Sequence, residues 1–288
     1  MNIPQCDFAL IGGSSTLSVN LPEEINLDYV EVKETGLVFA TPFGQSPEFK
    51  SILLKTDDGN RRVLSCRMHG WRSGVSRADA SRQVFWVFKN AGIKKVLAEG
   101  GVGAINHLLK PRDLVIPHDY IDFSVRKDVG LGDQHLLIMR DSMCPIIRRA
   151  LLNAGEDQWQ GRVFDRSVYV NTDGRHFESP AEINLFKMAG ADVVGQSLCP
   201  EVYLAREIGA CYAGVYLVVN YAEGIISPWQ HEELAEIYYS EGCELGKLLF
   251  ETLRRLPIER ECQCAELRKE TLLKDIYTSA TYPEPEPE

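Results

Sequence analysis

Short apolar runs rich in branched and aromatic residues alternate with longer amphipathic segments along most of the chain. Apolar runs of this kind predict strands buried in a sheet, and the amphipathic segments between them predict helices that cover it. The expected strands are residues 8–11, 37–40, 51–54, 62–66, 95–98, 113–116, 168–170, 191–194 and 213–219. The expected helices are residues 78–92, 142–154, 180–190, 200–208 and 231–255. The alternation favours an α/β fold with a central sheet.

The domain organisation is simple. The helix expected at 180–190 has a clear start, because Ser179 precedes Pro180 and Glu182 follows three residues after the serine, which is the pattern of a capping box. No stretch with the composition of a linker interrupts the alternation, so we expect one domain over residues 1–278. Residues 279–288 end in alternating proline and glutamate, which predicts a disordered tail.

The charge balance narrows the possible partners. The 288 residues carry 31 basic and 41 acidic side chains, a net charge of −10, so neither nucleic acid nor an anionic membrane is an expected partner. No apolar stretch has the length of a membrane span, and the first residues lack the basic and apolar regions of a signal peptide. We therefore expect a cytoplasmic protein.

Eight cysteines are spread along the chain, and most lie among apolar residues. We expect them to be reduced core residues, as is usual inside cells. Cys262 and Cys264 differ, because only one residue separates them. A strained disulfide or a metal clip would explain this spacing, but no second pair of cysteine or histidine lies near it in the sequence. No metal site is predicted, and the role of this pair stays open.

Polar or glycine-rich segments follow several of the expected strands. The carboxyl ends of strands in an α/β sheet commonly build the ligand site. The segments are Gly12 to Ser15, Arg67 to His69, Glu99 to Gly103, His176 to Ser179, Gly195 to Ser197, and Asn220. Their shared position after strands predicts one common site.

Two of these segments suit a bound oxyanion. In Gly12 to Ser15, glycine lets backbone N–H groups converge on an anion and serine adds a hydroxyl donor, although a plain tight turn has the same composition. Arg67 and His69 alternate at the end of an expected strand, so we expect both side chains on one face, where they suit a dianion. The alternative for this pair is a surface salt bridge beside a hydrogen-bonded core histidine.

Three further residues suit a planar heterocycle. Phe177 can pack against a ring, and Glu178 can accept hydrogen bonds from ring N–H groups. Asn220 ends an apolar strand, where its amide can donate to a carbonyl or to a ring nitrogen. The alternatives are a core aromatic next to a solvated acid, and a polar residue that merely ends a strand.

Other chemistries find little support in the motifs. The chain has no Gly-x-Ser-x-Gly sequence, and no Gly-Lys-Ser/Thr or third glycine follows Gly12. Glu99 lies in the glycine-rich segment 99–103, which we expect to be a turn. We expect Glu99 to support that turn rather than to act in catalysis.

Longer motifs carry a resemblance to a known family. They are Asp173 to Glu182 (DGRHFESPAE), Gly190 to Ser197 (GADVVGQS), Pro200 to Val202, and Leu204 to Glu207. From about Phe8 to about Leu253 the chain resembles the trimeric purine nucleoside phosphorylase and methylthioadenosine (methylthioinosine) phosphorylase family. The resemblance implies a single α/β domain with a central mixed, partly barrel-like β-sheet flanked by helices. It also implies a homotrimer, and no cofactor, with inorganic phosphate as co-substrate.

The resemblance further implies a role for each site residue. Phosphate would contact Ser14, Arg67, His69, Gly100, Gly101 and Ser197, the sugar would contact Trp71, Gln196 and His231, and the base would contact Phe177, Glu178 and Asn220. Among these, Asn220, His69 and Arg67 would act in catalysis. The family closes its site with a residue of a neighbouring subunit, for which His135 is a candidate.

The base-binding pair indicates which purine is preferred. Within the family, glutamate at position 178 with asparagine at 220 resembles the enzymes for 6-oxopurines, whereas enzymes for 6-aminopurines usually carry serine and aspartate. A 6-oxopurine offers N1–H to Glu178 and O6 to Asn220, whereas the N1 of adenine is an acceptor that an ionised Glu178 repels.

The expected activity is phosphate-dependent cleavage of the N-glycosidic bond of a 6-oxopurine nucleoside such as inosine, guanosine or 5′-methylthioinosine. The products would be the free base and a pentose 1-phosphate. The alternatives are a methylthioadenosine phosphorylase, a nucleoside hydrolase on the same fold, and a nucleoside-binding protein with weak catalysis. The chain departs from the family pattern in three features: Gln196 replaces a methionine, Arg175-His176 replaces a Pro-Arg or similar pair, and Glu99 stands in the glycine-rich segment.

Overall fold

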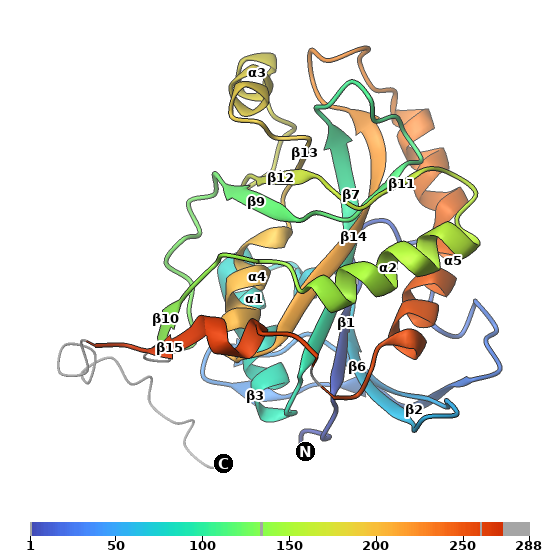
Figure 1. Cartoon of the computed structure of the whole chain (residues 1–288), viewed down its shortest axis with the longest axis vertical. Coiled ribbons are helices and arrows are strands. Elements are labelled where there is room, and N and C mark those ends of the chain that lie inside the picture. The colour runs from blue at the N-terminus through green and yellow to red at the C-terminus, as the bar shows by residue number, and fades with distance from the viewer. Residues whose placement is uncertain (1, 133–134, 260, 273–288) are drawn as a thin grey trace.

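Two long neighbouring strands, β7 (Lys95–Ala104) and β14 (Cys211–Tyr221), run parallel through the middle of the molecule. The computed structural model describes residues 2–132, 135–259 and 261–272, and Figure 1 shows how its elements are arranged. Both strands consist mostly of apolar and glycine residues, because nearly every position in them is buried. They form the centre of the largest sheet.

The other strands extend this sheet on both sides and give it a branch. On the β7 side the order is β1 (Phe8–Ile11), β6 (Arg61–Cys66), β5 (Phe49–Leu54) and β2 (Val30–Leu37), and on the β14 side it is β8 (Leu114–Val115) and β11 (Val163–Phe164). The carboxyl end of β7 pairs instead with β13 (Val193–Gly195), followed by β12 (Val168–Asn171) and β9 (Asp119–Asp122). Parallel and antiparallel pairs both occur, so the sheet is mixed as expected.

Helices flank the central strands in Figure 1, with α1 and α4 to their left and α5 to their right. The helices are α1 (Arg77–Asn90), α2 (Pro145–Gln158), α3 (Pro180–Met188), α4 (Leu198–Glu207) and α5 (His231–Arg255), with short 3-10 turns at Met68–Gly70 and Cys264–Leu267. Two small antiparallel pairs complete the structure: β3 (Ala40–Thr41) with β4 (Gly44–Gln45), and β10 (His135–Leu137) with β15 (Arg268–Glu270). The expected α/β class is confirmed.

The start of α3 follows from its sequence signal. The Ser179 hydroxyl accepts a hydrogen bond from the backbone N–H of Glu182 at 3.3 Å, and the Glu182 carboxylate accepts one from the backbone N–H of Ser179 at 2.8 Å. These reciprocal bonds are the predicted capping box, and they satisfy two backbone donors that a helix start leaves free. The prediction of α5 over residues 231–255 is also confirmed.

Two local predictions were wrong. The strand expected at 37–40 breaks after Leu37, because Phe39 and Ser46 exchange hydrogen bonds of 2.9 and 3.0 Å that turn the chain toward β3 and β4. The turn expected at 99–103 is instead the second half of β7, where the residues pair with β14. Glycine weakens an isolated strand, but here the neighbouring strand supplies the hydrogen bonds.

No helix in the described part of the chain is long and apolar enough to cross a membrane. The tail expected at 279–288 lies outside the described residues, as does the end of the domain expected at 278.

Candidate active site

A cavity of about 370 Å³ opens where β7, β13 and β14 approach their carboxyl ends. Its size falls within the usual range for a small-molecule site. Ten of the twelve residues predicted for the site line it: Ser14, His69, Trp71, Gly100, Gly101, Phe177, Glu178, Gln196, Ser197 and Asn220. The structure therefore brings together residues that are spread over two thirds of the sequence.

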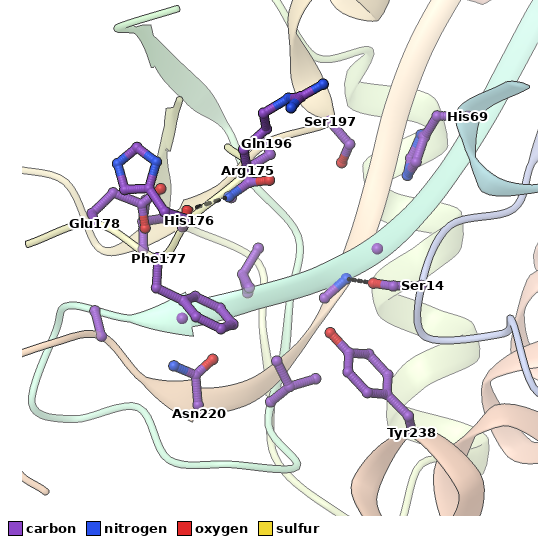
Figure 2. A pocket seen from close by; sticks show the side chains of 18 of the residues that line it. Ser14, His69, Arg175, His176, Phe177, Glu178, Gln196, Ser197, Asn220 and Tyr238 are labelled. Atoms are coloured by element: carbon purple, nitrogen blue, oxygen red, sulfur yellow. Dashed lines mark hydrogen bonds between the residues drawn. The ribbon is translucent and has the colours of Figure 1, made fainter. Parts of the chain in front are cut away.

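The cavity has two chemically different ends. Figure 2 shows Ser14, His69 and Ser197 on one side, and Phe177, Glu178 and Asn220 on the other. The first side presents hydroxyl groups and an imidazole, whereas the second presents a ring, a carboxylate and an amide. One side suits an oxyanion and the other suits a heterocycle with both donors and acceptors.

Two serine hydroxyls approach the glycines of β7. Ser14 Oγ accepts a hydrogen bond from the backbone N–H of Gly101 at 3.1 Å. A Cβ added at Gly101 would lie 2.6 Å from the Tyr238 hydroxyl, and one added at Gly100 would lie 3.3 Å from Ser197 Oγ. Only glycine at 101 lets the strand pass this close to both Ser14 and Tyr238.

His69 is buried and held by a carboxylate. Its Nδ1 lies 2.8 Å from Oε1 of Glu201, whose other oxygen accepts a hydrogen bond of 2.9 Å from the Tyr212 hydroxyl. A carboxylate can only accept, so Nδ1 carries a proton. The other ring nitrogen, Nε2, faces Gly13, since a Cβ added there would lie 2.6 Å from it.

The expectation that the Arg67 and His69 side chains lie on one face of a strand was wrong. Strand β6 ends at Cys66, and Met68 and His69 adopt positive φ values of 48° and 54° in a 3-10 turn, so the two side chains do not share a strand face. Arg67 is exposed, donates to the carbonyl of Leu17 at 2.5 Å, and does not line the cavity. The alternation rule fails because it applies only to extended backbone.

Glu99 holds the Gly12–Ser15 turn, together with Thr16 directly after it, against β7. The side chain is fully buried, and its Oε1 accepts hydrogen bonds from the backbone N–H of Gly13 and, at 2.6 Å, from the hydroxyl of Thr16. Burial raises the pKa of this carboxyl above its ordinary value, and the hydrogen bonds from Thr16 and Gly13 oppose this effect. Glu99 thus supports a turn, although not the one at 99–103 that we expected.

The three base-binding candidates are anchored in different ways. The Phe177 ring is 46% exposed and packs against Trp229 with a centroid distance of 4.8 Å. Glu178 is buried and accepts a hydrogen bond of 2.6 Å from the Thr172 hydroxyl, and buried Asn220 donates to the carbonyl of Tyr221 at 2.7 Å. The carboxylate and the amide are therefore oriented before any ligand binds.

Gln196 and Trp71 belong to a polar wall between the two ends. Gln196 donates to the His176 carbonyl at 3.2 Å and accepts from Arg77 at 3.3 Å. The Arg77 guanidinium stacks over the Trp71 ring at 4.0 Å, a favourable cation–π contact. His231 is exposed at the first residue of α5 and does not line the cavity.

Sequence reasoning missed several residues that line the cavity, among them Arg77 from α1 and Tyr238 from α5. Tyr238 is one turn after Leu234 on the inner face of an amphipathic helix, which could have marked it as buried but not as part of the site. Arg77 carries no local signal. His135, the candidate for contact with another subunit, lies in β10 and does not line this cavity.

Comparison with known proteins shows the family to which the chain belongs. The model of the phosphorylase superfamily matches residues 8–254. The chain belongs to the phosphorylase superfamily, and the family predicted from its motifs is confirmed.

Several relatives cover almost the whole chain. The 6-oxopurine nucleoside phosphorylase of Pyrococcus furiosus is 34% identical over 275 residues, which are 91% of this chain and 97% of the relative. A probable 6-oxopurine nucleoside phosphorylase of Dictyoglomus turgidum is 37% identical, with the same coverage of 91% and 97%. A probable S-methyl-5′-thioinosine phosphorylase of Thermodesulfovibrio yellowstonii is 31% identical over 93% of this chain and 98% of its own length.

A solved structure has the same fold. The methylthioadenosine phosphorylase of Schistosoma mansoni, in complex with adenine, superimposes with a TM-score of 0.74. The alignment covers 90% of this chain and 95% of the other at 20% sequence identity. At that identity the likeness is one of fold alone.

Proposed function

We propose that this protein cleaves the N-glycosidic bond of 6-oxopurine nucleosides with inorganic phosphate and releases the base and a pentose 1-phosphate. The observation that carries the proposal is one cavity with Ser14, His69 and Ser197 at one end and Glu178 with Asn220 at the other. Relatives named for 6-oxopurine nucleosides and for methylthioinosine support the choice of substrate class.

In the proposed reaction, a phosphate oxygen forms the new bond to the anomeric carbon as the bond from that carbon to the purine breaks. The bonding electrons leave with the base, and one of its ring nitrogens then takes up a proton to give the neutral purine. The sugar passes through a cation-like state that the neighbouring phosphate stabilises, so positioning and electrostatics supply most of the rate enhancement. No cofactor takes part in this scheme.

The phosphate would accept hydrogen bonds from Ser14, Ser197 and the backbone near Gly100 and Gly101. His69 would face the anion with Nε2 while Glu201 holds Nδ1, so the carboxylate fixes the orientation of the ring. Arg67 would reach the anion by releasing the carbonyl of Leu17, which is a weaker partner than a dianion.

The base would pack against Phe177, with N1–H donating to Glu178 and O6 accepting from the Asn220 amide. As negative charge develops on the leaving purine, the amide stabilises it. The sugar would lie along Trp71 and Gln196, and we propose that His231 approaches it from the start of α5. Gln196 makes this wall more polar than the methionine of the family pattern.

The proposal extends to assembly and compartment. We propose a homotrimer in the cytoplasm, with a neighbouring subunit closing the open side of the cavity. The family resemblance supports the trimer. The eight cysteines without a disulfide among the described residues support a reducing compartment. Sedimentation analysis of the purified protein tests the trimer directly.

Base release from inosine, 5′-methylthioinosine, adenosine and 5′-methylthioadenosine, each with and without phosphate, tests the proposed reaction. We expect release only from the two 6-oxopurine nucleosides and only with phosphate. Release of adenine at a comparable rate would overturn the role of Glu178 and Asn220. Release without phosphate would identify a hydrolase, and binding without release from any nucleoside would identify a binding protein.

A further inference from the structure

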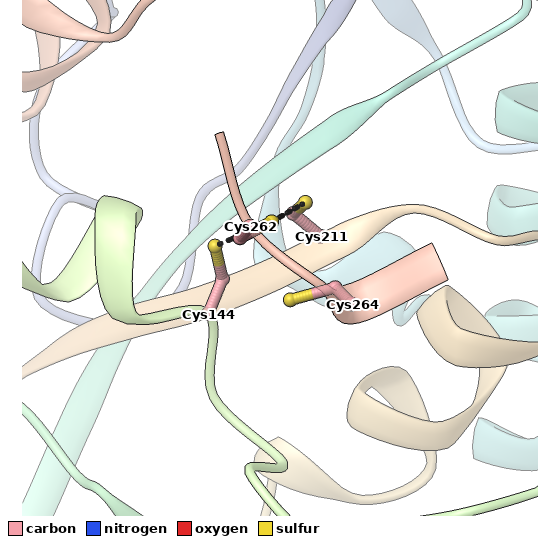
Figure 3. A group of neighbouring side chains, drawn as sticks. All are labelled: Cys144, Cys211, Cys262 and Cys264. Carbon is pink, nitrogen blue, oxygen red and sulfur yellow. Dashed lines mark hydrogen bonds between the residues drawn. The ribbon is translucent and has the colours of Figure 1, made fainter. Parts of the chain in front are cut away.

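Four cysteines from three distant parts of the chain converge outside the cavity. Cys144 immediately precedes α2, Cys211 begins β14, and Cys262 and Cys264 follow α5. Their four sulfur atoms all lie within 4.8 Å of one another. Figure 3 shows the four side chains as neighbours. None of the four lines the candidate active site.

The spacing of the sulfurs fits a single metal ion. The Sγ atoms of Cys144 and Cys262 are 3.7 Å apart, and those of Cys211 and Cys262 are 3.3 Å apart. A tetrahedral zinc ion with Zn–S bonds of about 2.3 Å separates its sulfurs by about 3.8 Å. A disulfide would need a separation of about 2.05 Å, and it would join the sulfurs only in pairs. The cluster therefore has the dimensions of a tetrathiolate site.

The surroundings suit negatively charged sulfur. Cys144 occupies the N-cap position of the 14-residue helix α2, so the positive end of the helix lies beside its sulfur. Buried Arg206 donates to the carbonyl of Cys264 at 3.4 Å and to the carbonyl of Asp141 at 2.9 Å. Four thiolates around a divalent ion carry a net charge of −2, and these groups offset part of it.

The exposure of the four residues matches a structural site. Cys144, Cys211 and Cys264 are buried, whereas Cys262 is partly exposed and leaves a route for an ion to enter. Four protein ligands would fill a tetrahedral shell, so no open position would be left for a substrate or for water. An ion here would hold the chain rather than take part in chemistry.

We propose that Cys144, Cys211, Cys262 and Cys264 bind one zinc ion as a structural tetrathiolate site. The four thiols lose their protons to solvent as the ion binds, and no atom changes its oxidation state. The ion ties the segment after α5 to the starts of α2 and β14. The same segment is also held by hydrogen bonds from Lys95 to the carbonyls of Pro257, Ile258 and Glu259, by the short pairing of β15 with β10, and by the contact of Arg206 with the Cys264 carbonyl. The site does not depend on the proposed reaction.

Metal analysis of the full chain tests the proposal. The protein is expressed with zinc in the medium, purified without reductant and without chelator, and measured by inductively coupled plasma mass spectrometry. We expect about one zinc ion per chain, released stoichiometrically when a mercurial reagent titrates the thiols. Replacing zinc with Co²⁺ should give the intense visible bands of a tetrahedral cobalt thiolate. Iron in place of zinc would overturn the assignment of the ion.

Variants and a thiol count separate this site from disulfides. Cys264→Ser and Cys144→Ser should lose most of the zinc, whereas the control Cys243→Ser, on a cysteine of α5 outside the cluster, should keep it. If the buried variants do not fold, the wild-type chain still decides the question, because a zinc site leaves all eight thiols titratable after denaturation without reductant. Two results would overturn the proposal. One is a count of fewer than eight thiols in a protein without metal, and the other is an unchanged zinc content in Cys264→Ser.

Discussion

The imidazole of His69 lies 2.8 Å from the carboxylate of Glu201, and both side chains are buried. The two residues are 132 positions apart, and they meet because the turn after β6 faces the first turn of α4. The carboxylate fixes which ring nitrogen carries a proton and leaves the other directed at Gly13. The orientation of His69 thus depends on a residue that does not itself line the cavity.

Glu201→Gln should weaken the use of phosphate. The change replaces the charged acceptor of the His69 Nδ1–H by a neutral amide while keeping the size of the side chain. A hydrogen bond to a charged group contributes about 1.5–3 kcal/mol, so we expect kcat/KM for phosphate to fall about 10- to 100-fold. Steady-state kinetics at varied phosphate concentration measures this fall in kcat/KM. The exposed Glu244→Gln on α5 is the control, and equal kinetics for the two variants would contradict the role of Glu201.

Arg67→Ala should reduce phosphorolysis although the arginine does not line the cavity. Loss of one charge-assisted donor to the transition state costs roughly 2–4 kcal/mol, or about 30- to 1000-fold in rate. Arg62→Ala, on exposed Arg62 of the preceding strand β6, should leave the rate unchanged. Full phosphate-dependent activity in Arg67→Ala would contradict this role and would mean that the Arg67 guanidinium of the wild type stays on the carbonyl of Leu17.

Asn220→Asp should change the preferred purine. The new carboxylate repels O6 of a 6-oxopurine and can accept from the 6-amino group of adenine. Each unmatched buried pair costs about 1–3 kcal/mol, so inosine cleavage should fall by about 10- to 100-fold relative to adenosine cleavage. The ratio of the two kcat/KM values measures it. Asn153→Asp on the exposed side of α2 should leave the ratio as it is in the wild type, and an unchanged ratio in Asn220→Asp would remove this residue from base recognition.

Glu99→Gln should flatten the dependence of stability on pH. Burial raises the pKa of Glu99 in the folded protein, so the folded state binds a proton more tightly than the unfolded state does. The resulting stabilisation is complete below the ordinary carboxyl pKa of about 4.3 and is lost as the pH rises toward the raised value. Urea denaturation across this range measures the slope. Identical slopes for the wild type and Glu99→Gln would show that another group causes it.

Gly101→Ala should disturb the oxyanion end of the cavity. The added Cβ would lie 2.6 Å from the Tyr238 hydroxyl and 3.1 Å from Ser14 Oγ. Overpacking of this kind typically costs 1–3 kcal/mol of folding free energy, which thermal denaturation detects. Because the closest clash is with the hydroxyl, the double variant Gly101→Ala/Tyr238→Phe should regain part of that loss. No recovery would mean that the backbone of β7, and not Tyr238, has to move.

Local patterns predicted the elements whose formation depends on nearby residues. The capping box at Ser179 and Glu182 and the amphipathic spacing of α5 act within a few residues, so the sequence is sufficient to identify them. Predictions failed where distant contacts override local preference. Gly100 and Gly101 form a strand because β14 pairs with them, and the chain leaves the sheet after Leu37 because Ser46 bonds to Phe39.

The residues of the candidate active site divide in the same way, into those predicted from local motifs and those placed by distant contacts. The order of its motifs identified the family and ten of the residues that line the cavity. The positive φ of His69, the position of Arg67 on Leu17, and the approach of Arg77 and Tyr238 carry no local signal, because each results from packing between elements remote in the chain.

The sequence by itself determined the α/β class, the helix boundaries to within a few residues, and the family, because periodicity, caps and contiguous motifs are local properties. Only the tertiary structure decided which side chains meet. Cys144 and Cys211 join Cys262 and Cys264 across 118 and 51 residues, as His69 joins Glu201 across 132. Such contacts arise when the sheet and its helices bury their apolar faces together, and that step depends on the whole chain at once.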